Sequence, residues 1–228
     1  MNQSIANLRT LDLSKNNLKI LSNRLSELKK IKFLNCDKQN KGLDPGSIHV
    51  ISTLSNLQNF SCAENKLGKR EPDTTNGLSK HTPSALPDLP LSIKQLNLNS
   101  NFFSSFPPQI IFLSRLEKLD LSKNSLITIP AEISNLVSLT DLNLDQNSVV
   151  ALPEEIGTLK KLKSLSLQYN GIHVHSTSFS EKNPQPLPAL LFTSTPIIDL
   201  KLTGNQITNT QLVSTFLIFF LFSVFSEL

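Results

Sequence analysis

Apolar residues recur along the chain in a fixed frame that begins L-x-x-L-x-L-x-x-N. From residue 116 the chain reads LEKLDLSKNSLITIPAEISNLVS, 23 residues later LTDLNLDQNSVVALPEEIGTLKK, and 23 residues further on LKSLSLQYNGI. The first position of the frame is occupied in eight copies, by Leu8, Ile31, Leu57, Ile93, Leu116, Leu139, Leu162 and Ile197. A repeat of this length indicates units that stack on one another, because a single unit cannot bury its own apolar edge.

Within each repeat, positions 4 and 6 are apolar or cysteine and the positions around them are mostly polar. This alternation predicts one short strand per repeat that buries a single face. The inward pairs are Leu11/Leu13, Leu34/Cys36, Phe60/Cys62, Leu96/Leu98, Leu119/Leu121, Leu142/Leu144, Leu165/Leu167 and Leu200/Leu202. We expect the strands to form a parallel sheet, with residues such as Ile129, Ile133 and Leu136 filling the space behind it.

Asparagine makes up 22 of the 228 residues, and the repeat explains part of this excess. Position 9 is asparagine in seven of the eight copies: Asn16, Asn65, Asn101, Asn124, Asn147, Asn170 and Asn205. The second copy has Gln39 there, or Asn40 if its turn is one residue longer. An asparagine side chain carries both donors and an acceptor, so a stacked column can satisfy the backbone groups of successive turns. We therefore predict a structural asparagine ladder.

The period is interrupted three times, with intervals of 26, 36 and 35 residues in place of 23. The two longest intervals contain stretches rich in Pro, Ser and Thr, which predict loop insertions at about 68–85 and 173–186. Leu86-Pro87 and Leu187-Pro188 would resume the frame after them. The loops are either tolerated surface segments or segments for a partner or phosphorylation. Cys36 and Cys62 occupy the same inward position of adjacent repeats, and we expect both to be buried, reduced thiols.

We assign residues 1–212 to the repeat domain and residues 213–228 to an apolar, phenylalanine-rich tail. The run LVSTFLIFFLFSVF is shorter than the roughly 20 residues that a membrane span requires, and three interpretations remain open: an altered terminus, a short membrane anchor or a packed terminal cap. The start, MNQSIANLRT, lacks the apolar region of a signal peptide. We expect a cytoplasmic protein, or alternatively a membrane-associated adaptor that is anchored through the tail.

The full repeats continue with Leu-Pro or Ile-Pro, then an isoleucine and a leucine, as in Ile129-Pro130, Ile133 and Leu136. This pattern resembles the short intracellular class of leucine-rich repeats found in Ras-suppressor, Shoc-type and Scribble-type proteins. The segment LPALLFTSTPIIDLKLTGNQITNTQL is similar to the last repeats of the leucine-rich-repeat-containing protein fifty-seven group. The resemblance implies an α/β fold, a right-handed solenoid with a concave parallel sheet and an irregular or short-helical convex side. It also implies a non-catalytic scaffold, in some members bound to small GTPases or phosphatases.

The outward positions 3, 5 and 7 would form columns of short polar side chains on the concave face, where curved repeat arrays commonly bind partners. Our candidate partner-binding residues are Asn97, Asp120, Asp141, Asn143 and Asp145, with Tyr169 and Phe33 as aromatic anchors. The acidic residues favour a basic segment of a protein partner, and such binding should weaken with salt.

Other classes of function find little support in the sequence. The four histidines lie outside the expected strands, and neither a phosphate-binding loop nor a glycine-rich fingerprint is present. We therefore predict no catalytic residue, no metal site and no cofactor. The net charge is +4 without a long basic run, so we expect no nucleic-acid partner. The lack of a signal peptide and of cysteine-rich caps disfavours a receptor ectodomain, and we expect a monomer.

Overall fold

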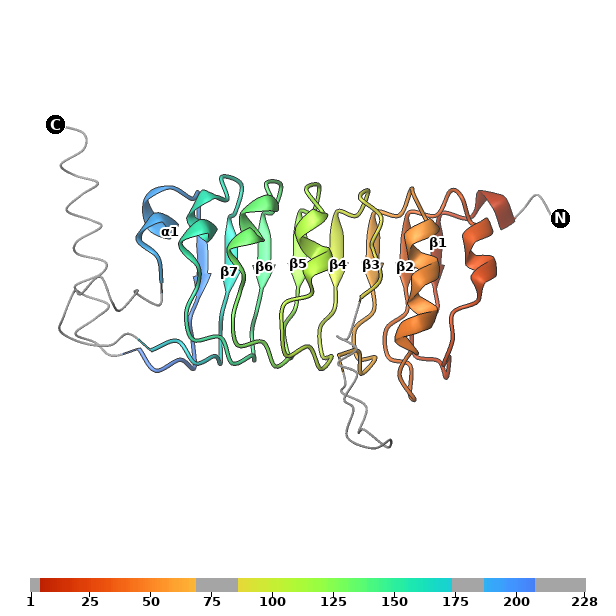
Figure 1. The fold of residues 1–228 in the computed structure, drawn as a ribbon, viewed down its shortest axis with the longest axis horizontal. Helices are drawn as coiled ribbons and strands as arrows, with labels where there is room; N and C mark the ends of the chain where they lie inside the picture. The colour runs from red at the N-terminus through yellow and green to blue at the C-terminus, as the bar shows by residue number, and fades with distance from the viewer. Residues whose placement is uncertain (1–4, 69–85, 174–186, 208–228) are drawn as a thin grey trace, which may run out of the picture.

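The computed structural model describes residues 5–68, 86–173 and 187–207, which form one parallel sheet of eight three-residue strands in chain order. The strands follow one another along the long axis of the molecule (Figure 1). They are β1 (Thr10–Asp12), β2 (Phe33–Asn35), β3 (Asn59–Ser61), β4 (Gln95–Asn97), β5 (Lys118–Asp120), β6 (Asp141–Asn143), β7 (Ser164–Ser166) and β8 (Asp199–Lys201). Each strand covers positions 3 to 5 of its repeat, which confirms the predicted solenoid.

The register of the sheet pairs identical repeat positions throughout. Thr10 lies opposite Phe33 in the first pair, and Asn59 lies opposite Gln95 although 36 residues separate them in the chain. The same register holds between β7 and β8, across the other long interval. The extra residues therefore leave the strand pairing unchanged, as the sequence predicts. Residues 69–85 and 174–186, which contain most of both predicted insertions, lie outside the described residues.

Short helices cover one side of the sheet and form a second layer (Figure 1). They are the 3-10 helices η1 (Ile5–Asn7), η2 (Asn23–Glu27), η3 (Pro45–Thr53), η4 (Pro108–Phe112), η5 (Ala131–Asn135) and η6 (Glu154–Thr158), and the α-helix α1 (Ala189–Thr193). The Leu/Ile-Pro motif explains where several of them begin. Pro130 and Pro153 are the residues that precede η5 and η6, with φ of −75° and −70°, because the proline ring fixes φ near these values.

The two Leu-Pro pairs that follow the insertions have different outcomes. Leu187 lies ten residues before the next repeat begins, the same distance as Ile129, and Pro188 precedes α1. Leu86 lies only seven residues before Ile93, which leaves too little chain for a helix, and residues 86–94 contain none. Leu86 nevertheless packs into the core, with 3% of its surface exposed.

The core consists of the inward residues of all repeats, and its interior copies are more completely buried than its ends. Leu119 and Leu121 are at most 2% exposed, whereas Leu11 and Leu200 are half-buried and pack against the edge of the core. Among the described residues, the first and the last repeat have one stacking neighbour instead of two, which accounts for the difference.

Cys36 and Cys62 are free thiols with no exposed surface, which confirms their predicted burial. Burial raises the pKa of Cys36 to about 12 and that of Cys62 well above its ordinary value, because the apolar surroundings disfavour the thiolate. Both residues are therefore packed as small apolar side chains, and neither thiol is activated as a nucleophile.

The predicted asparagine ladder is present, and its hydrogen bonds connect adjacent repeats. Asn147 illustrates an interior rung: its Nδ2 donates to the carbonyl oxygens of Leu121 and Leu144, both at 3.0 Å, and its Oδ1 accepts from the N–H of Leu126 at 2.9 Å. Leu121 belongs to the preceding repeat and Leu144 to the same repeat as Asn147. Every rung after Asn16 therefore ties two turns together.

Gln39 is the member of the ladder in the second repeat, which settles the alternative with Asn40. Its Nε2 donates to the carbonyl of Leu13 at 2.7 Å, and its Oε1 accepts from the N–H of Leu18 at 3.0 Å. Asn40 instead bonds Asn17 at the surface. In the third repeat, Oδ1 of Asn65 is buried without a hydrogen-bond partner among the described residues, at the point where the preceding repeat is three residues longer.

Position 8 of the repeat has left-handed backbone geometry, which the sequence does not reveal. Seven copies have a non-glycine residue with φ between 53° and 60° there, and only the last has glycine: Lys15, Lys38, Glu64, Ser100, Lys123, Gln146, Tyr169 and Gly204. The stacked turns hold these residues in a conformation that L-residues adopt at a cost. Within the described residues, no helix is long and apolar enough to cross a membrane, and the tail at 213–228 lies outside them.

Candidate interaction groove

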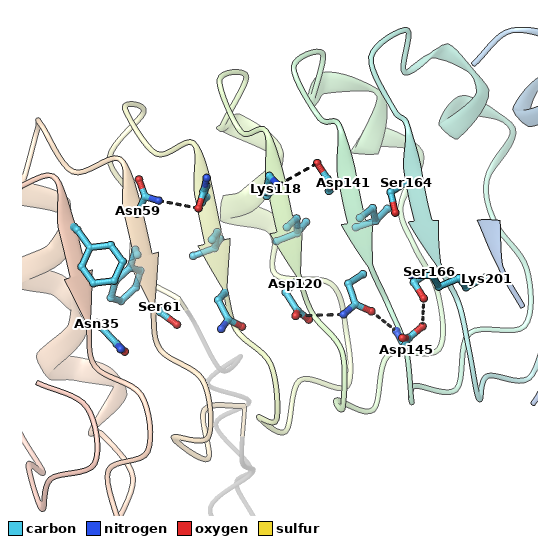
Figure 2. Close-up of a pocket in the computed structure, with 18 of the residues that line it drawn as sticks. Asn35, Asn59, Ser61, Lys118, Asp120, Asp141, Asp145, Ser164, Ser166 and Lys201 are labelled. Carbon is cyan, nitrogen blue, oxygen red and sulfur yellow. Dashed lines mark hydrogen bonds and ion pairs between the residues drawn. The ribbon is translucent and has the colours of Figure 1, made fainter. Parts of the chain in front are cut away.

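The side chains on the sheet face opposite the short helices line a groove of about 530 Å³, which we call the strand groove. This is the face on which the repeat pattern places the outward positions 3, 5 and 7. The groove extends across β2 to β8, so it draws on seven consecutive repeats (Figure 2). Its lining residues at positions 3 and 5 are Phe33, Asn35, Asn59, Ser61, Gln95, Asn97, Lys118, Asp120, Asp141, Asn143, Ser164, Ser166 and Lys201.

The structure gathers six of the seven predicted partner-binding residues in this groove. They are Phe33, Asn97, Asp120, Asp141, Asn143 and Asp145. Tyr169 does not line it: it lies at position 8, in the turn after β7, with φ of 54° and 57% of its surface exposed. Its ring packs so closely against Gly204 that a Cβ added to the glycine would lie 2.7 Å from Cε1 of the tyrosine.

In five of the eight described strands, the residue at position 5 makes a local hydrogen bond at the end of the strand. A side-chain oxygen there accepts from the N–H two residues later, as in the bonds to Asp120 from Ser122 at 2.8 Å and to Asn143 from Asp145 at 3.1 Å. Asp12, Asn35 and Asn97 make the same bond. This Asx geometry satisfies a backbone donor as the chain leaves the sheet. The Asp and Asn residues of this column therefore have a structural task beside any task in binding.

Two aspartates at position 7 perform this task for the following repeat where that repeat has serine at position 5. Asp145 Oδ1 accepts from Ser166 Oγ at 2.6 Å and from the N–H of Gln168 at 2.7 Å. Asp37 likewise accepts from Ser61 Oγ and from the N–H of Ala63, both at 2.6 Å. In both repeats the serine hydroxyl donates to the preceding aspartate, and that aspartate supplies the acceptor for the N–H.

Burial raises the pKa of Asp37, and the hydrogen bonds from Ser61 and Ala63 oppose part of this effect. Asp12 occupies the exposed first strand, where the bonds from Ser14 lower its pKa. The contrast follows from solvation: hydrogen bonds stabilise a solvated carboxylate directly, whereas a half-buried one first loses hydration.

Charged residues line only the β5–β8 half of the strand groove. Figure 2 shows Asp120, Asp141 and Asp145 on adjacent repeats, with Asn143 Nδ2 donating to Asp120 at 3.2 Å. Lys118 Nζ lies 3.8 Å from Asp141 Oδ2. Lys201, at the end of the groove, pairs with Asp199 at 3.2 Å. Among the described residues, Asp120 and Asp145 have no such cationic partner, so their negative charge faces the groove uncompensated.

The β2–β4 half of the groove is neutral. Asn59 Nδ2 donates to Gln95 Oε1 at 2.8 Å across two adjacent strands (Figure 2). Phe33 on β2 is half-buried, and Phe60 on β3 is 2% exposed at the floor of the groove. The sequence columns contain Asn59, Gln95 and Lys118, but composition alone does not separate these groove residues from ordinary solvated positions.

The described residues contain no cluster of three or more His, Cys, Asp or Glu side chains that could hold a metal ion. His49 is exposed in η3, on the helical side, and His173 forms an isolated bridge with Gln206 beyond β7. His81 and His175 lie outside the described residues.

Sequence profiles described as leucine rich repeat match residues 92–149 and 7–31. These are segments in which the frame is regular. These two segments match leucine-rich repeats, and the parallel sheet repeats the same frame over all eight described strands. No curated protein matches it significantly, so the Shoc-type and fifty-seven-type resemblance stays a sequence prediction.

Solved structures, among them a leucine-rich repeat ectodomain, resemble this chain over most of its length. The ectodomain of the receptor kinase GASSHO1/SCHENGEN3 from Arabidopsis thaliana, in complex with CASPARIAN STRIP INTEGRITY FACTOR 2, is 26% identical with a TM-score of 0.59 over 88% of this chain and 25% of that one. The plant peptide hormone receptor RGFR1 in complex with RGF2 is 25% identical with a TM-score of 0.56, over 88% and 33%. TLR13 in a complex with ssRNA13 shares the fold at 24% identity and a TM-score of 0.63, over 88% and 25%. The chain thus spans a third or less of these structures.

Proposed function

We propose that this leucine-rich repeat chain is a non-catalytic interaction module that binds a segment of a protein partner in the strand groove. The observation that carries the proposal is the groove itself, a hollow of about 530 Å³ on the open face of the sheet. Its walls are side chains from seven repeats whose register is uniform. A rigid array of this kind holds its polar groups in place before a partner arrives, which lowers the entropic cost of binding.

Two structural neighbours support a peptide or protein as the partner. The GASSHO1/SCHENGEN3 and RGFR1 structures are complexes with CASPARIAN STRIP INTEGRITY FACTOR 2 and with RGF2. Leucine-rich repeats are generally binding modules, and curved repeat arrays commonly use the strand face. We propose the same mode of use for this chain, with a partner of its own.

The finer features of the proposal rest on sequence. We propose a monomeric adaptor in the cytoplasm, in small-GTPase or phosphatase signalling, as the resemblance to the short intracellular class implies. The uncompensated carboxylates of Asp120 and Asp145 favour a basic segment of the partner, and affinity should fall as salt concentration rises.

Site-specific photo-cross-linking tests the proposed function. We would place p-benzoylphenylalanine at Gln95, in the middle of the groove, or at Ser105, which is exposed in the same repeat but does not line the groove. The proposal predicts discrete protein adducts in cell extract from position 95, fewer of them at high salt, and few or none from position 105. Equal adduct formation at the two positions would contradict it.

A further inference from the structure

The strand groove has a neutral half and a charged half. This inference rests on the proposed function and uses the difference between the halves to specify the chemistry of the bound segment. We propose that the groove binds an extended peptide carrying one apolar residue and one basic residue four to six positions apart. The apolar residue contacts Phe33, the basic residue lies between Asp120 and Asp145, and the peptide crosses the strands.

The apolar end is defined by Phe33 together with the lack of charged side chains among the described residues that line this end of the groove. All groove-lining residues from β2 to β4, within the described part of the chain, are uncharged. Phe33 retains exposed surface at position 3, where the flanking strands carry Thr10 and Asn59. An aromatic side chain held on a rigid strand offers a large contact area at a small entropic cost, which is characteristic of binding anchors.

The middle of the groove offers amide groups to a peptide backbone. Gln95 uses Oε1 to accept from Asn59, and Asn97 uses Oδ1 to accept from the N–H of Asn99 at 3.0 Å. Nε2 of Gln95 and Nδ2 of Asn97 have no hydrogen-bond partner among the described residues. These two donors lie on one strand and are suited to the carbonyl groups of an extended chain.

The basic end is defined by carboxylates whose bonds neutralise no charge. Asp145 accepts from Ser166, from the N–H of Gln168 and, through Oδ2, from Gln168 Nε2 at 3.1 Å. Asp120 accepts from Ser122 and Asn143. All of these donors are neutral, so none of these bonds places a positive charge beside either carboxylate. Hydrogen bonds also fix their positions, and a fixed carboxylate is a favourable partner for the planar guanidinium of arginine.

The separation of the two ends sets the spacing within the peptide. Phe33 is on β2, Asp120 is on β5, and Asp145 follows β6, so three to four strand intervals separate the ends. At about 4.8 Å per interval this is roughly 14–19 Å. An extended chain advances about 3.3 Å per residue, which gives about four to six residues between the apolar and the basic side chain.

The experiment is a selection of displayed random 12-residue peptides on the full chain, followed by affinity measurements on the enriched sequences. Enriched peptides should share an apolar and a basic residue at the stated spacing. Their affinity should fall about tenfold in Phe33→Ala and in Asp120→Asn/Asp145→Asn. Asparagine keeps the acceptor oxygen that the turns require, and circular dichroism verifies folding.

Matched controls separate the groove from general effects of substitution. Asp12 occupies the same repeat position as Asp120 and makes the same 2.8 Å Asx bond, but it lies outside the groove, so Asp12→Asn is the control for the charge change. Phe112→Ala is the control for Phe33→Ala, because it removes a phenylalanine that is 66% exposed on the helical side. Both should leave affinity unchanged. A third variant, Gln95→Arg, blocks the middle of the groove.

The outcomes distinguish this inference from the proposed function. Some enriched peptides will fail to bind Gln95→Arg. If these peptides lack the spaced pattern, or if they bind Phe33→Ala and Asp120→Asn/Asp145→Asn with normal affinity, the inference alone is overturned. Peptides that bind Gln95→Arg normally, or a selection that enriches none, overturn the proposed function as well.

Discussion

The asparagine ladder gives a prediction that is specific to position within the array. We consider Asn147→Ala, in an interior rung. The substitution removes four hydrogen bonds: three from Nδ2, to the carbonyls of Leu121, Leu144 and Asp145, and one to Oδ1, from the N–H of Leu126. The four losses are not equal, because some of the partner groups have a second bond.

All three carbonyls keep a partner after the substitution. Leu121 O still accepts from Asn124 at 2.9 Å, Leu144 O still accepts from Asn170 at 2.9 Å, and Asp145 O still accepts from the N–H of Lys123 at 2.7 Å. The N–H of Leu126 has no replacement acceptor. Leaving a buried donor unpaired costs about 1–3 kcal/mol. Each of the three other bonds contributes about 0.5 kcal/mol, the lower end of the usual net value, because its carbonyl keeps a partner, so we expect Asn147→Ala to destabilise the fold by about 2.5–4.5 kcal/mol.

Asn16→Ala is the matched control, since Asn16 occupies the same position in the first repeat. Among the described residues, its side chain donates only to the carbonyls of Leu13 and Ser14 in its own repeat, at 2.9 and 3.1 Å, and it is exposed. We expect a cost below about 1 kcal/mol. Urea unfolding followed by circular dichroism measures both variants. Equal losses of unfolding free energy at the two positions would refute the reasoning, because the inter-repeat bonds would then contribute nothing.

Three further predictions concern packing, protonation and thiol reactivity. Gly157→Ala should destabilise the chain by about 1–3 kcal/mol through overpacking, because the new Cβ would lie 2.7 Å from the carbonyl carbon of Leu190. Thermal unfolding measures this loss. An unchanged midpoint would show that α1 moves away from the new methyl group at no cost. The folded-state pKa of Asp37 is raised, so the stability associated with its protonated form is lost as pH rises from its ordinary value of 3.8 through the raised value. Asp37→Asn should therefore gain unfolding free energy relative to the wild type between about pH 3 and pH 7, and a pH-independent difference in urea midpoints would contradict this. Cys36 and Cys62, buried with raised pKa values, should react with a thiol reagent only after unfolding; rapid labelling of the native protein would show that the core opens.

The sequence is sufficient to predict the strands because their register repeats the frame. Leu119 and Leu121 alternate with polar neighbours, as burial of a single strand face requires, and Asn124 follows at a fixed distance. The ladder is predictable as well, since an asparagine that recurs at the same turn position indicates a structural task that every repeat shares. Both features depend on periodicity, which is a property of the sequence itself.

The remaining features depend on contacts between repeats that the frame does not encode. The left-handed backbone geometry at Lys123 cannot be predicted from the residue type, because lysine does not favour this conformation. The repeat pattern identifies Asp145 only as an outward-facing charge, although this residue also accepts hydrogen bonds from Ser166 and from the N–H of Gln168 in the next repeat. Tyr169 is aromatic and exposed, but its position in the turn takes it outside the groove lining. In each of these, the neighbouring repeat decides the role of the residue.

The central claim is that a partner segment occupies the strand groove. Its most direct test uses a partner that photo-cross-linking has identified. The affinity of this partner is measured for two variants that each introduce an arginine into the same repeat, Gln95→Arg in the groove and Ser105→Arg outside it. The claim predicts a loss of about tenfold or more for Gln95→Arg and no change for Ser105→Arg. Equal affinities for the two variants would contradict it.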